Sequence, residues 1–62
     1  MSSKLTNDWN ELKVLIESLD LDIYKNANGN KSAGVRARKG LRLLKQKSAE
    51  LVKASLETDK GN

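Results

Sequence analysis

A stripe of large apolar residues in the first half of the chain constrains the fold most strongly. Its members are spaced alternately by four and three positions: Leu5, Trp9, Leu12, Ile16, Leu19 and Ile23. This spacing brings them onto one side of an α-helix. Acidic residues near the start of the stripe, Asp8 and Glu11, suit the positive end of a helix dipole. We therefore predict a first helix over residues 5–26.

A second helical pattern occupies the other half of the chain. Small and apolar residues again recur every three or four positions: Ala33, Ala37, Leu41, Leu44, Ser48, Leu51 and Ser55. Gly34 and Gly40 oppose this pattern, because glycine in a helix interior costs about 1 kcal/mol relative to alanine. The pattern still predicts a second helix over residues 32–57, followed by a flexible tail at 59–62.

Turn-forming residues separate the two patterns. Residues 26–30 combine three asparagines with one glycine, and both residue types accept left-handed backbone angles. We expect Gly29 to end the first helix and Asn30 or Ser32 to cap the second. Residues 1–62 are therefore predicted to form one all-α domain, an antiparallel and coiled-coil-like hairpin of two helices with its turn at 27–31.

A hairpin of 62 residues has a single helix–helix seam, so its own hydrophobic core is small. Scattered apolar residues are common on protein surfaces, but the small core favours a second packing surface. We therefore predict a homodimer with four helices. Its interface is expected at the apolar residues that lie off both seams: Val14, Leu21, Val35 and Leu43.

The composition excludes several functions. The chain contains no cysteine and no histidine, which excludes zinc sites of the Cys/His kind and histidine acid–base catalysis. No glycine run reads as a phosphate loop. We expect no catalysis, metal, cofactor or small-molecule substrate. No apolar run approaches the roughly 18 residues that span a bilayer, and residues 1–4 introduce no signal-peptide segment. These observations predict a cytoplasmic protein.

Charge is segregated along the chain. Residues 1–24 carry two lysines and five carboxylates, whereas residues 25–49 carry eight cations and no carboxylate. Surfaces whose charges only maintain solubility normally mix both signs. A segment this basic is typical of a surface that binds backbone phosphates. We predict a nucleic-acid-binding face on the second helix, formed by Lys31, Arg36, Arg38, Lys39, Arg42, Lys45 and Lys47.

The predicted partner is double-stranded DNA, bound through its backbone phosphates. Aromatic residues are absent from residues 25–49, and Trp9 belongs to the predicted core stripe, so stacking on single-stranded bases is disfavoured. No recognisable frame for reading bases is present, which indicates little sequence preference. RNA stays open as a partner, because sequence does not resolve groove shape.

A motif within the basic segment resembles a known family. Residues 29–39 read Gly-Asn-Lys-Ser-Ala-Gly-Val-Arg-Ala-Arg-Lys, between an acidic Leu/Ile-rich helix and a Leu/Lys-rich one. Over about residues 5–56 this order resembles the bacterial linker-histone-like family, typified by the chlamydial histone-like protein that condenses the nucleoid. The resemblance implies a helical, nucleoid-associated DNA-binding protein. It places the family's basic motif on Lys31, Arg36, Arg38 and Lys39.

The better-known members of that family carry a long Lys/Ala/Pro-rich tail, which this sequence does not contain. Binding through a few phosphate contacts, or bridging of DNA by a dimer with a basic face at each end, is therefore expected in place of strong compaction by a single chain. Two other interpretations stay open. One is a protein-interaction hairpin without a nucleic-acid role, in which Val14 and Leu21 form the contact. The other is binding to an anionic membrane surface, which requires an exposed apolar face that the second helix offers little of.

Overall fold

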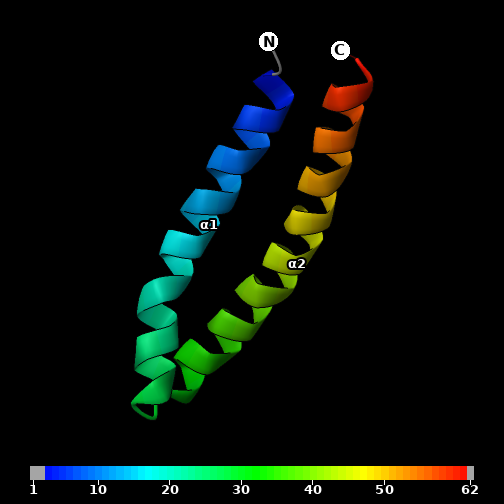
Figure 1. Ribbon diagram of the computed structural model, residues 1–62. Coiled ribbons are helices and arrows are strands. Elements are labelled where there is room, and N and C mark those ends of the chain that lie inside the picture. Colours follow the sequence, from blue (N-terminus) through cyan, green and yellow to red (C-terminus); the bar gives the residue numbers. More distant parts are fainter. Residues whose placement is uncertain (1–2, 62) are drawn as a thin grey trace.

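The computed structural model describes residues 3–61 and consists of two antiparallel helices joined by a short turn (Figure 1). Helix α1 comprises Ser3–Ala27 and helix α2 comprises Lys31–Lys60. The molecule is elongated, with principal extents of 49 × 15 × 11 Å between Cα atoms. The described part of the chain contains no strand. The predicted all-α hairpin is therefore confirmed.

The turn between the helices depends on one glycine and one asparagine. Gly29 has a φ of +100°, a left-handed conformation that disfavours any residue with a Cβ. The backbone N–H of Asn30 donates to the Lys25 carbonyl at 2.9 Å, which satisfies a free carbonyl at the end of α1. The Asn30 side chain accepts from the Ala33 N–H at 2.9 Å. Asn30 is therefore the N-cap of α2, and Ser32 lies inside the helix.

Both helices extend beyond the predicted bounds. In the first turn of α1, the Lys4 ammonium lies 3.0 Å from the Asp8 carboxylate. This hydrogen bond raises the pKa of Lys4 above its usual value. At the other end, α2 continues to Lys60, and the Gly61 N–H donates to the Glu57 and Thr58 carbonyls of the last turn. Residues 59 and 60 are thus helical, whereas residues 1–2 and 62 lie outside the described residues.

The residues of α1 that face α2 form a row that shares only its leucines with the predicted stripe. Leu12 and Leu19 are each only 7% exposed. Half-buried residues continue their row: Leu5, Asp8, Leu15 and Asp22. The other members of the predicted stripe, Trp9, Ile16 and Ile23, are largely exposed, so their assignment to the hairpin core was wrong. This rotation of α1 brings carboxylates within reach of cations on α2.

Small residues of α2 let the helices come close near the turn. Ala33 and Ala37 are buried there. A Cβ added at Gly40 would overlap the end of the Leu19 side chain, so glycine at this position lets Leu19 pack closely against α2. Gly40 thus replaces the predicted Leu41 in the seam, and Ala54 replaces Ser55. The helices lie closest near the turn and diverge toward the chain ends (Figure 1).

Candidate nucleic-acid interface

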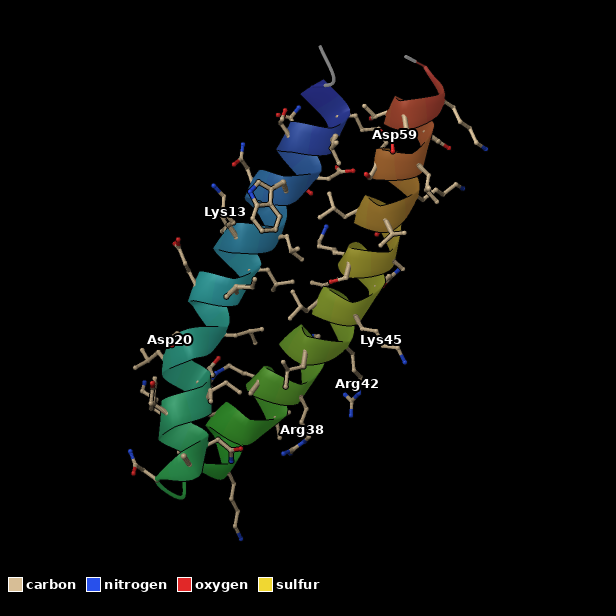
Figure 2. All side chains as sticks on the ribbon, in the orientation of Figure 1. Lys13, Asp20, Arg38, Arg42, Lys45 and Asp59 are labelled. Carbon is tan, nitrogen blue, oxygen red and sulfur yellow. The ribbon has the colours of Figure 1, made fainter. Side chains whose placement is uncertain are left out.

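Three cations line the side of α2 that faces away from α1. Arg38, Arg42 and Lys45 follow one another at intervals of four and three residues, which places them on one side of the helix. All three are exposed and project outward from α2 (Figure 2). Within residues 3–61 none of them forms an ion pair. We call these three residues the basic edge.

Two further cations extend the basic edge along α2. Lys31 precedes Arg38 by seven residues, and Lys53 follows Arg42 by eleven. Both intervals are close to whole numbers of helical turns, so these exposed lysines lie on the same side as the basic edge. Lys39 is exposed next to this side and shares a shallow groove with Arg42.

The other two predicted binding residues, Arg36 and Lys47, are engaged with α1. Both Arg36 Nε and Nη2 lie 3.1 Å from the Asp22 carboxylate oxygen Oδ1. Lys47 Nζ lies 3.4 Å from a Glu11 oxygen. The seven predicted residues therefore do not form one uniform surface. Five point to solvent, while two link the acidic helix to the basic one.

The family of the chain follows from a comparison with family models. Residues 6–61 match the model described as histone H1-like protein Hc1, which covers nearly the whole chain and the entire basic edge. The chain belongs to the Hc1 family. This family consists of histone H1-like, DNA-binding proteins of the nucleoid, with a structural rather than an enzymatic role. The resemblance to linker-histone-like proteins is confirmed. No curated protein and no solved structure matches the chain significantly.

A metal site and a membrane span are two further features that residues 3–61 of this Hc1-family hairpin do not show. No group of three or more acidic residues among residues 3–61 could hold a metal ion. Neither α1 nor α2 contains a stretch, within the described part of the chain, that is long and apolar enough to cross a membrane. The surface features that the described residues of this Hc1-family chain offer for binding are the basic edge and the exposed apolar residues.

The apolar residues predicted at a dimer interface are exposed but dispersed. Val14 and Leu21 each lie two positions after a buried leucine of α1, which turns them away from the seam. Leu43 lines a groove with Arg42 on another side of the molecule. Val35 is also exposed. An interface at these four residues stays a prediction.

Trp9 was the residue that sequence reasoning placed least well. Its side chain is 47% exposed, and the Lys13 ammonium lies 5.9 Å from the centroid of its ring, within the range of a cation–π contact. The spacing of Trp9 from Leu5 and Leu12 fits the seam. The structure shows which side of α1 faces α2, and on that helix the Trp9 ring lies beside the seam.

Proposed function

We propose that this single hairpin domain binds double-stranded DNA without sequence preference, through the basic edge of α2. The observation that carries the proposal is the run of three exposed cations without an ion-pair partner among residues 3–61. Membership of the Hc1 family supports DNA as the ligand. Arg36 and Lys47 contribute less, because Asp22 and Glu11 already compensate their charges.

The length of the basic edge fits the spacing of DNA phosphates. From Arg38 to Lys45 the helix rises about 10 Å, at 1.5 Å per residue. One DNA strand carries a phosphate for each 3.4 Å or so of helix axis. The edge therefore extends over about three phosphates. The guanidinium groups of Arg38 and Arg42 suit forked contacts with phosphate oxygens, and Lys45 supplies a point charge.

This mode of binding explains the expected lack of sequence preference. Contacts to phosphates position a protein on DNA but carry no direct sequence information. Residues 25–49 contain no aromatic side chain that could stack on a base. Binding is then driven by the release of counterions from the DNA, and the affinity falls as the salt concentration rises. RNA duplexes carry the same phosphates and are a possible second ligand of the edge.

A homodimer would carry two basic edges. Each edge would bind one duplex, so a dimer would hold two DNA segments together. Bridging of this kind is the role that we propose for the protein on the nucleoid.

The test compares two double variants that each remove two positive charges. We expect Arg38→Gln with Arg42→Gln to weaken binding to labelled random-sequence duplex DNA, measured by fluorescence anisotropy. The slope of log K against log salt should fall in magnitude by about 1.8, because two phosphate contacts are lost. The matched control, Lys4→Gln with Lys60→Gln, removes charges at the far end of the hairpin and should leave most of the affinity.

Circular dichroism would verify that both variants keep their helices. Equal losses in the two variants would mean that only net charge matters. An unchanged affinity in a folded Arg38→Gln/Arg42→Gln protein would exclude the basic edge as the binding surface.

A further inference from the structure

Arg36 is held by a carboxylate although it lies close to the basic edge. Its Nε and Nη2 atoms both lie 3.1 Å from Oδ1 of Asp22 on α1. The side chain of Arg36 is nevertheless 54% exposed, whereas that of Asp22 is 20% exposed. The arginine is thus paired with an anion but stays accessible from solvent.

A shallow groove on α2 connects Arg36 with the basic edge. It has a volume of about 510 Å³, and its lining consists of Arg36, Lys39, Gly40, Arg42, Leu43 and Gln46. Lys39 and Arg42 form no ion pair within residues 3–61. Gln46 is exposed and carries an amide N–H donor. The described residues that line the groove therefore offer three cations and a neutral donor, and none of them is acidic.

This set of side chains suits a phosphate of the DNA backbone. Arginine donates to phosphate oxygens through a planar fork, and lysine supplies a point charge. From Arg36 to Arg42 the helix rises about 9 Å, at 1.5 Å per residue. A phosphate in the groove would then lie beside the phosphates that the basic edge binds.

Asp22 competes with such a phosphate for the same arginine. Carboxylates and phosphates both accept hydrogen bonds from the guanidinium fork. A carboxylate that stays beside Arg36 also repels an approaching phosphate. The ion pair has little weight in the fold itself, because pairs at a protein surface contribute little to stability. Its main effect is therefore on what Arg36 can bind.

We propose that the groove between Arg36 and Arg42 is a second phosphate-binding site, which Asp22 keeps incomplete by sequestering Arg36. This inference rests on the proposed function, because it concerns phosphates of the same DNA that the basic edge binds. In the wild type the basic edge sets the number of phosphate contacts, and Arg36 adds none. Loss of the negative charge at position 22 completes the site and adds one contact. The acidic helix thus limits how tightly the hairpin binds DNA.

Lys47, the other cation that α1 engages, is sequestered more thoroughly. Its ammonium lies 3.4 Å from a Glu11 oxygen, and its side chain is 33% exposed. Asp8, Glu11 and Glu50 line a small pocket together with Lys47, so three carboxylates lie around one ammonium. Removal of Glu11 leaves two of them in place. A single substitution is therefore expected to release Arg36 but not Lys47.

The test is a titration of each variant into labelled random-sequence duplex DNA at several salt concentrations, followed by fluorescence anisotropy. Asp22→Asn should steepen the slope of log K against log salt by about 0.9, because one phosphate contact is added. At about 0.1 M salt the affinity should rise about eight-fold, which is the contribution of one such contact through counterion release.

The matched control is Asp20→Asn, which removes the same charge from the same helix. Asp20 projects away from α2 (Figure 2) and forms no ion pair within residues 3–61. Its substitution releases no cation, so the slope should stay at the wild-type value. Glu11→Gln should also leave the slope unchanged, because Asp8 and Glu50 still lie beside Lys47.

A double variant assigns the gain to Arg36. In Asp22→Asn with Arg36→Gln, the added contact should disappear and the slope should return to the wild-type value. Arg36→Gln alone should leave the wild-type slope unchanged, since the sequestered arginine makes no contact with DNA. Circular dichroism verifies that each variant keeps its helices. If Asp22→Asn does not fold, Arg36→Gln decides alone: a slope smaller in magnitude by about 0.9 would show that Arg36 already binds DNA and would overturn the proposal.

Two further outcomes would overturn the proposal. One is the same slope in Asp22→Asn and Asp20→Asn. The other is weaker binding of Asp22→Asn, because Asp22 would then orient Arg36 toward DNA instead of sequestering it. Failure of the basic edge has a different signature, since the wild type itself would then show no salt-dependent binding. A wild type that binds, together with an unchanged slope in Asp22→Asn, would overturn the second site alone.

Discussion

At the scale of single residues, the contact between Gly40 and Leu19 sets how closely the two helices approach. A Cβ at position 40 would overlap the Leu19 side chain, and Leu19 is itself buried, so it has little space to move. The cost of glycine in the helix is therefore offset by the close packing that it permits.

The effect of Gly40→Ala on the free energy of unfolding should depend on the side chain at position 19. Gly40→Ala should lower the free energy of unfolding by about 1 kcal/mol, because overpacking outweighs the gain in helix propensity. In a Leu19→Ala background the same substitution should be stabilising by up to about 1 kcal/mol, since the space is then free. Urea denaturation of the wild type, the two single variants and the double variant, all at one protein concentration, measures both changes in the free energy of unfolding. A stabilising effect in both backgrounds would show that the helices do not touch here.

At the scale of the helices, the sequence was sufficient for some features and insufficient for others. The turn and the Asn30 cap were predictable, because residues within five positions of one another determine them. The side of α1 that faces α2 was not. Leu12 and Leu19 belong to two neighbouring rows, one containing Trp9 and Ile16 and the other containing Asp22. Hydrophobicity favoured the first row, but the structure uses the second.

The choice between these rows depends on residues far away in the sequence. Asp22 faces the hairpin interior because Arg36 on the other helix pairs with it. The position of the basic edge was predictable from the charge pattern alone, whereas the ion pairs of Arg36 and Lys47 were not, because they depend on the register between helices.

The assignment of the seam is testable by truncating two leucines of α1. Leu12→Ala should reduce the free energy of unfolding by about 2–4 kcal/mol and lower the helical content of a marginal hairpin. Leu21→Ala removes an exposed side chain, and its effect should stay within about 0.5 kcal/mol. Thermal denaturation followed by circular dichroism compares the two. Equal effects would contradict the assigned seam.

At the scale of the whole molecule, charge and hydrophobicity are distributed over different surfaces. The acidic α1 and the basic α2 are linked on one side by two ion pairs, whereas exposed large apolar side chains such as Trp9, Ile16 and Leu41 lie on the other side. The basic edge lies along the outer side of α2, where Figure 2 shows Arg38, Arg42 and Lys45 projecting away from α1. The cations of the basic edge are therefore separate from the cations that hold the two helices together.

The most direct test of this account is a titration of the wild-type protein into labelled random-sequence duplex DNA at several salt concentrations. With three cations of the basic edge and Lys31 on phosphates, log K should fall linearly with log salt, with a slope of about −3.6. A second, unrelated duplex should give the same line. No binding near 50 mM salt, or an affinity that does not change with salt, would contradict binding through the basic edge.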